Sequence, residues 1–138
     1  MIYVLYNVKL EKALCRMGND TSADYIYMWR EDITTSPRYS YFCIGDEKVP
    51  LLIISLAMGY TMRVNDTNEI SVVVDFVKGS EAKWEDIVVV PFITEVLYTS
   101  NPYRPHLRWR YMDFTKAYPI LDLVRNRLSE KYPEYEQF

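Results

Sequence analysis

The sequence predicts an α+β fold: a mostly antiparallel sheet of five or six strands, covered by two or three helices of which one is C-terminal. Two observations predict it. Short runs rich in Val, Ile, Tyr and Phe are separated by turn signals, as in hairpins. Two other segments are bounded by the proline and glycine signals of helices. With 138 residues, 49% of them hydrophobic and 25% charged, the chain is expected to form a single globular domain over residues 1–138.

The N-terminal third is expected to supply three strands. The apolar run from Ile2 to Leu10 predicts a buried strand. Residues 11–17 are ambiguous, and their pattern is compatible with one or two helical turns ending at Gly18. The aromatic-rich stretches 24–31 and 38–44 predict two further strands, joined by a loop that ends in Ser-Pro.

A buried helix is expected next. Pro50 suits the first turn of a helix, and the acidic Asp46 and Glu47 before it favour a helix N-terminus. Gly59 is placed to end the helix with a left-handed residue. Leu51 to Met58 is apolar nearly all round, so the helix should be buried; a buried strand is the rival interpretation.

The middle of the chain is expected to form a hairpin followed by a helix. Tyr60–Val64 and Glu69–Val77 flank the turn signal Asn-Asp-Thr-Asn, which predicts paired strands. From Ser80 onward, apolar residues at helical spacing favour a helix kinked near Pro91, whereas the run 87–90 of Ile and Val favours a strand.

The C-terminal part is expected to end in a helix. Pro119 marks its start and Pro133 its end, and Leu121, Val124 and Leu128 form its apolar stripe.

The most informative feature lies between these segments. If Arg104 to Asp113 is a strand, its period of two sends every basic residue of this stretch to one face. The other face should pack on a core. The basic set is Arg104, His106, Arg108 and Arg110, and it alternates with Pro105, Leu107, Trp109 and Tyr111.

Three interpretations of this basic strand stay open. Guanidinium groups spaced roughly 7 Å apart match a row of phosphates or carboxylates, so the strand could bind nucleic acid or an acidic protein surface. In the third, it is a solvated strand whose arginines face glutamates across the ladder.

An aromatic panel is the second candidate surface. Tyr25, Tyr27 and Trp29 share one face of their strand, and Tyr39 and Tyr41 share a face of the next. Such a panel could stack bases, lie buried beneath a helix, or form a dimer face. It lacks the glycine-and-aromatic spacing of an RRM.

Charge and cysteine content narrow the functional classes. The net charge is −3, and residues 101–138 hold seven Lys and Arg against five Asp and Glu, so the positive charge is concentrated late in the chain. A dedicated duplex-DNA binder would be more basic, but a chain with this asymmetry can dock on copies of itself. The N-terminus has no secretory signal and no segment is long enough for a membrane span, so we expect an intracellular, cytoplasmic protein (in the host cytoplasm if viral) with reduced Cys15 and Cys43.

No complete catalytic or cofactor motif is present. Asp46-Glu47-Lys48, with Asp32 and Asp75, has the acid-x-lysine form of one group of Mg²⁺-dependent nucleases, but a three-residue match of this kind arises easily by chance. His106 with Cys15 or Cys43 would make a thiol–base dyad, again without a supporting motif. No phosphate loop or dinucleotide fingerprint is found, and we expect neither a cofactor nor a bound metal.

The leading functional hypothesis is therefore a small, non-enzymatic interaction or regulatory protein that acts as a homo-oligomer. Its binding surface is expected to comprise Arg104, His106, Arg108, Trp109 and Arg110, with Tyr25, Tyr27 and Trp29 as a second patch. Viral inhibitors and accessory factors are often of this size and kind, an analogy only. A single-stranded nucleic-acid binder is the alternative, and a metal-dependent nuclease is a more distant one.

Overall fold

The computed structural model describes residues 1–17, 26–31, 39–41, 43–62, 68–123, 125, 130, 132 and 135–137. Within this part of the chain, eight strands join in one antiparallel sheet, and two short strands form a second sheet. The large sheet contains β1 (Ile2–Asn7), β2 (Lys12–Met17), β3 (Ile26–Arg30), β4 (Tyr39–Tyr41), β5 (Cys43–Ile44), β7 (Ile87–Tyr98), β8 (His106–Met112) and β9 (Tyr118–Pro119); the small sheet pairs β6 (Tyr60–Met62) with β10 (Tyr135–Gln137).

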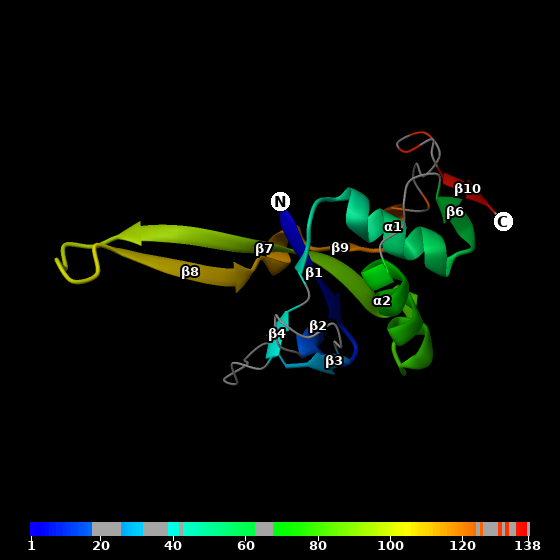
Figure 1. The fold of residues 1–138 in the computed structure, drawn as a ribbon, viewed down its shortest axis with the longest axis horizontal. Helices are drawn as coiled ribbons and strands as arrows, with labels where there is room; N and C mark the ends of the chain where they lie inside the picture. The colour runs from blue at the N-terminus through cyan, green and yellow to red at the C-terminus, as the bar shows by residue number, and fades with distance from the viewer. Residues whose placement is uncertain are drawn as a thin grey trace.

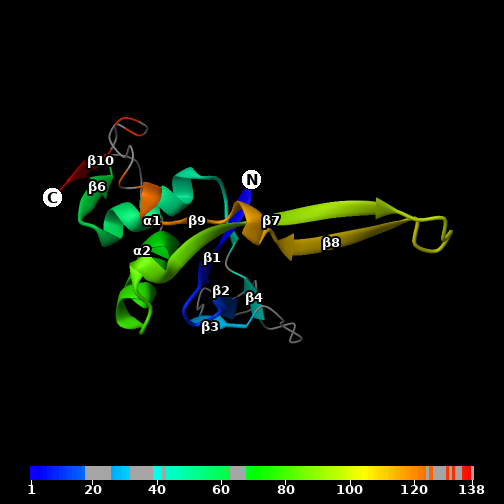
Figure 2. The same ribbon diagram turned by 180° about the vertical axis from the view of Figure 1, so that it is seen from behind.

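The path through the large sheet is β3-β2-β1-β7-β8, with β4 on β2, β5 on β1 and β9 on β7. β1 pairs with β7 only as far as Ile2 opposite Phe92. β7 then continues for six more residues beside β8 alone. This part of the two strands extends well away from the rest of the molecule, which we call the body (Figures 1 and 2).

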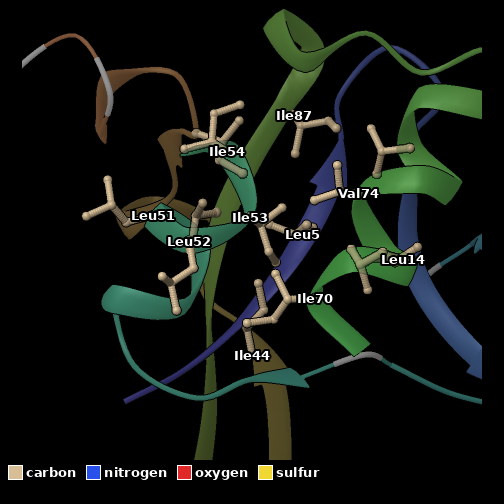
Figure 3. Close-up of a cluster of buried hydrophobic side chains, with 14 of the residues drawn as sticks. Leu5, Leu14, Ile44, Leu51, Leu52, Ile53, Ile54, Ile70, Val74 and Ile87 are labelled. Atoms are coloured by element: carbon tan, nitrogen blue, oxygen red, sulfur yellow. The ribbon is translucent and has the colours of Figure 1, made fainter. Parts of the chain in front are cut away.

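Two helices, α1 (Lys48–Ala57) and α2 (Asn68–Gly79), pack against each other and cover one face of the sheet in the body (Figure 1). Their apolar side chains meet those of β1, β2, β5 and β7 in the main core (Figure 3). The labelled members are Leu5, Leu14, Ile44, Leu51, Leu52, Ile53, Ile54, Ile70, Val74 and Ile87.

The opposite face of the sheet carries a second, smaller cluster. Successive residues of a strand point to opposite faces, so Leu5 joins the main core while its neighbour Val4 joins Ala13, Val90 and Met112 in the small cluster. The cover of this face includes the short helix η2 (Phe114–Lys116), whose Phe114 ring meets Tyr6 edge-on with centroids 4.8 Å apart. We call this side of the sheet the open face, because α1 and α2 both lie on the opposite side.

The α+β class predicted from the sequence is confirmed, and five strands are at least five residues long (β1, β2, β3, β7 and β8). Helix α1 is confirmed as well. Pro50 lies in its first turn, Asp46 accepts a hydrogen bond from the backbone of Lys48, and Gly59 has a φ of 87° just after its end. The run from Pro50 to Ser55 is buried without a break, as expected for a helix that is apolar all round.

The predicted hairpin over residues 60–77 is wrong, because 68–79 form helix α2 and β6 pairs with β10. The β-branched residues of this segment favour strand by propensity. Their spacing nevertheless fits a helix, since Ile70, Val73, Val74 and Val77 lie at i, i+3, i+4 and i+7 and are all buried. Burial of this stripe outweighs the local preference.

Three other expectations also need correction. Residues 12–17 form strand β2, paired with β1 and β3, and not helical turns. Residues 84–92 are not a kinked helix: after a single 3₁₀ turn, η1 (Trp84–Asp86), they enter β7. Ile87, Val89 and Val90 are buried and Val88 is partly buried, with β1 paired on one side and β9 on the other, an environment that suits β-branched residues. At the C-terminus, Pro119 lies in β9, and the predicted helix falls largely outside the described residues, although positions 122, 123, 125 and 130 are helical. No helix in the described part of the chain is both long and apolar enough to cross a membrane.

Candidate interaction surface

The projecting part of β7 and β8 contains the basic strand and is the strongest candidate site. We call residues 93–111 the ribbon. Its Cα register sets Ile93 opposite Tyr111 at the base and Tyr98 opposite His106 near the tip. Six strand residues extend about 20 Å, so the ribbon reaches far beyond the helices (Figure 1). The apolar side of the basic strand was expected to pack on a core, but the side chains of Leu107 and Trp109 lie outside the described residues. Leu97, which lies opposite Leu107 in the register, is 49% exposed.

Arg104 lies outside the strand, because β8 begins at His106. It belongs to the tip loop of residues 99–105, which is held by its own hydrogen bonds. The amide of Thr99 donates to Pro105 O (2.9 Å), and the amide of Arg104 donates to Asn101 O (3.2 Å). Asn101 Oδ1 accepts from the amide of Tyr103 (2.9 Å). The tip thus presents Arg104 on a braced loop.

The other basic positions follow the open face of the sheet. Alternation places positions 106, 108 and 110 on the same face as Met112, which belongs to the small cluster. The residues opposite them are Tyr98, Val96 and Thr94, none of which is acidic. The third interpretation is therefore wrong in placing glutamates across the ladder, although His106 and Arg110 are exposed, as expected for a solvated strand.

Glu95 is the one acidic residue of the ribbon, and it belongs to the other face. It lies opposite Trp109 in the register and accepts a hydrogen bond from the Tyr111 hydroxyl (2.9 Å). This bond favours the protonated phenol and raises the pKa of Tyr111. With three arginines against one glutamate, the ribbon carries +2, and because the whole chain carries −3, the remainder carries −5.

At its base the arginine-bearing face meets the body near β5. Cys43 is exposed there, and it lies close enough to Arg110 and Arg16 to sense their charges. Desolvation raises the pKa of the Cys43 thiol, and the two guanidinium groups oppose that shift. His106 lies four residues further along the strand than Arg110, or roughly 13 Å away, so the structure does not bring the proposed Cys43–His106 dyad together. Cys15 is fully buried.

Apolar and aromatic side chains are exposed along the ribbon. Val96 is 45% exposed, Tyr98 86% and Tyr103 92%. Tyr98 is the last residue of β7, and Tyr103 lies in the tip loop. Since large apolar side chains exposed together mark interaction sites, the ribbon combines the composition of a binding surface with the shape of an arm. The side chains of Arg108 and Trp109 lie outside the described residues.

The aromatic panel is placed differently. Tyr27 is buried, packs against Phe76 of α2 (ring centroids 6.3 Å apart) and donates a hydrogen bond to Glu69 Oε1 (2.9 Å). Trp29 also packs on Phe76, and its indole nitrogen donates to Ser80 Oγ (3.3 Å). Of the three interpretations of the panel, these two residues therefore fit packing beneath a helix. Tyr25, and the side chains of Tyr39 and Tyr41, lie outside the described residues.

The suggested catalytic carboxylates are not assembled in the described part of the chain. Asp46 sits at the start of α1, while Asp75 is exposed on α2 instead of lying in a strand. Asp32 lies outside the described residues. Over the residues the structure describes, no group of three His, Cys, Asp or Glu side chains could hold a metal ion.

Comparison of the chain with protein-family models, with curated proteins and with solved structures found no match.

Sequence reasoning located the basic positions but missed their setting. Because residues 84–92 were assigned to a helix, the hairpin between β7 and β8 was not foreseen, and Val96, Leu97, Tyr98 and Tyr103 were left out of the candidate set. A usable signal was present. The loop Asn-Pro-Tyr-Arg-Pro lies between two β-rich runs, as in a hairpin with a long turn.

Proposed function

We propose that the protein is a small non-enzymatic interaction protein, which docks its ribbon onto a macromolecular partner and acts as a homo-oligomer. The observation that supports this proposal is the ribbon itself: a two-stranded arm outside the body with exposed tyrosines and with no acidic residue opposite its basic positions. An isolated two-stranded hairpin is marginally stable in water. An arm of this kind is therefore best explained by a partner that covers it.

The residues assigned to docking are Arg104, His106, Arg108, Trp109 and Arg110, to which the structure adds Tyr98 and Tyr103 at the tip. Guanidinium groups can each make two hydrogen bonds to a carboxylate, and tyrosine and arginine are the residues enriched at the centre of protein interfaces. Tyr27 and Trp29 are left out of the docking surface because they pack against α2.

An acidic protein surface is the preferred partner. Three arginines on a chain of net charge −3 give a weak electrostatic footprint for nucleic acid. Exposed Val96 on one face of the ribbon and Leu97 on the other suit a partner that buries apolar area, as protein interfaces do.

The test is charge reversal on the ribbon. The double variant Arg108→Glu/Arg110→Glu should weaken binding to an acidic partner by tenfold or more, since each lost contact between close charges is worth roughly 1.5 kcal/mol or more. Arg125→Glu makes the same exchange on an exposed residue away from the ribbon and should have little effect. Fluorescence anisotropy with a labelled acidic peptide and with a mixed single-stranded oligonucleotide, together with light scattering, would measure the effect. If oligomeric state and both binding reactions are unchanged in the double variant, the ribbon is not the docking element.

Single-stranded nucleic-acid binding is the second candidate, and a specific observation favours it. The rings of Tyr98 and Tyr103 are almost fully exposed beside Arg104, and bases can stack on such rings. The salt dependence of the binding affinity distinguishes the two candidate functions. Phosphate binding should fall log-linearly with added salt, whereas binding that depends on buried aromatic area should change little.

A further inference from the structure

The ribbon has two long edges, and they differ in a way that bears on self-association. On the β1 side, β7 has no strand partner among the described residues from Ile93 to Tyr98, because β1 begins opposite Phe92. On the other side, the outer edge of β8 also lacks a described partner. Unpaired backbone groups at an edge are a template for another strand.

The β8 edge is protected by its sequence and the β7 edge is not. Arginines at 108 and 110, with Pro105 just before the strand, are the residues by which proteins discourage edge pairing. The β7 edge reads Ile-Thr-Glu-Val-Leu-Tyr, with one charge and a high β-propensity. An edge of this composition is suited to being paired.

We propose that two copies of the chain pair β7 to β7 in antiparallel fashion along residues 94–98, which joins their ribbons into one four-stranded sheet. This inference rests on the proposed function, because it names a second copy as one occupant of the ribbon. It assigns self-association to the β7 edge and leaves the β8 edge, with its arginines, for another partner. Three or more strands are what an independent sheet needs, and the pairing supplies four.

Charge selects this arrangement over the alternative. In the order β8-β7-β7-β8, the two β8 strands are three strand spacings apart, about 14 Å. That distance exceeds the Debye length of about 8 Å at physiological salt, so the arginines of the two copies are screened from each other. Pairing β8 with β8 would set them about 5 Å apart.

Symmetry and charge also select the register. In an antiparallel pair related by a two-fold axis, one residue faces its own copy, and facing residues share one face of the sheet. Centring the axis on Glu95 would oppose two carboxylates, which is destabilising. Centring it on Val96 sets Glu95 opposite the partner's Leu97 and Thr94 opposite the partner's Tyr98, all within the stretch that β1 leaves unpaired.

The same register brings the tip loop of the partner copy near exposed apolar residues at the start of β1. β1 and the partner's β7 would lie along the same side of β7, one after the other. The tip loop of one copy then comes against the start of β1 in the other, where Met1 is 67% and Ile2 48% exposed.

The test compares two valines. Val96 is 45% exposed and Val72, on α2, is 46% exposed. In sedimentation velocity and light scattering, the wild-type chain should form a dimer. Val96→Lys should weaken it by tenfold or more, because two like charges would face each other across the axis. Val72→Lys, the same exchange on the body, should leave it unchanged, with circular dichroism confirming that both variants are folded.

The register is tested by cross-linking. In a Cys43→Ser background, Val96→Cys should form a covalent dimer on mild oxidation or with a short bis-maleimide, and Val72→Cys should not. A wild-type chain that is monomeric up to its solubility limit, an unchanged dimer in Val96→Lys, or no cross-link at 96 would overturn the pairing. Binding of acidic peptide or oligonucleotide by the same samples reports on the proposed function separately, because that surface lies on β8 and the tip.

Discussion

The two halves of β7 are one continuous strand in two different environments. From Ile87 to Pro91 the strand is mostly buried, with β1 on one side, β9 on the other and helices above. From Thr94 to Tyr98 every residue is exposed and β8 is the one strand that the structure places beside it. The comparison shows that the β7–β8 pairing continues beyond the point where β7 packs on the body. The inner half is stabilised by contacts within the chain, and the outer half exposes side chains that another molecule could bury.

The largest expected effect is on the free energy of unfolding, when a leucine of the core is truncated and compared with a leucine of the ribbon. Leu5→Ala empties a fully buried position of β1 beneath the helices and should lower the free energy of unfolding by about 2–5 kcal/mol. Leu97→Ala makes the same truncation on the ribbon, where the leucine is 49% exposed. It should change the free energy of unfolding by less than about 0.5 kcal/mol in dilute solution. Urea denaturation of both variants measures the difference. Equal losses would mean that the ribbon is part of the core.

The next effect compares two asparagines with the same local role. Asn7 Oδ1 accepts hydrogen bonds from the amides of Lys9 and Leu10 (both 3.0 Å) and is 1% exposed. Asn101 Oδ1 accepts from Tyr103 at the exposed tip. Asn7→Ala removes a buried acceptor and leaves two partly buried amides without it, which should cost about 1–3 kcal/mol of stability. Water can replace the lost acceptor in Asn101→Ala, so its thermal midpoint should stay near that of the wild type; an equal drop in both variants would contradict this explanation.

A smaller effect compares paired and unpaired charge. Glu69, in the first turn of α2, accepts from Arg16 (2.8 Å) and from Tyr27 (2.9 Å), which ties the helix to β2 and β3. The ion pair is about one-third exposed, so Glu69→Gln should cost only about 0.5–1 kcal/mol. The loss should shrink at high salt. Arg110→Gln on the ribbon removes no ion pair that the described residues show and should not lower stability in the same urea series.

The smallest expected effect is on the rate at which Cys43 is alkylated. Cys43 is exposed and Cys15 is fully buried, so one thiol should react with iodoacetamide in the native protein and two after unfolding. Because the pKa of Cys43 is raised, its labelling should be slow at neutral pH and accelerate as the pH rises. Arg110→Gln removes a charge that favours the thiolate and should slow labelling by roughly twofold. A rate independent of Arg110 would show that the ribbon base is not beside β5.

The sequence predicted the elements whose local signals agree with their packing. Helix α1 is bounded by Pro50 and Gly59 and is apolar on every side, so propensity and burial point the same way. In α2 they conflict, since Val73, Val74 and Val77 prefer strand locally but form one buried helical stripe against the sheet. That stripe is favoured by contacts with residues distant in sequence, which a single chain read in windows does not reveal.

The candidate site was predictable in its chemistry and not in its position. Alternation alone identified Arg108 and Arg110 as neighbours on one face, and the register agrees with that alternation. The turn signal between two β-rich runs points to β7 as the partner strand of β8. The sequence gives no sign that both strands would leave the body, because that depends on where β1 begins opposite β7. Tyr27 and Trp29 had an equally suggestive pattern, yet they pack beneath α2.

The braced tip loop has a consequence for reach. Its hydrogen bonds from Thr99 to Pro105 and within Asn101–Arg104 hold the loop in one shape at the end of the ribbon. A lever about 20 Å long converts a rotation of about 10° at its base into a sweep of roughly 3–4 Å at its end. A small bend at Phe92 and Met112 would therefore move Tyr103 and Arg104 together by a few ångströms, with the hydrogen bonds of the loop kept.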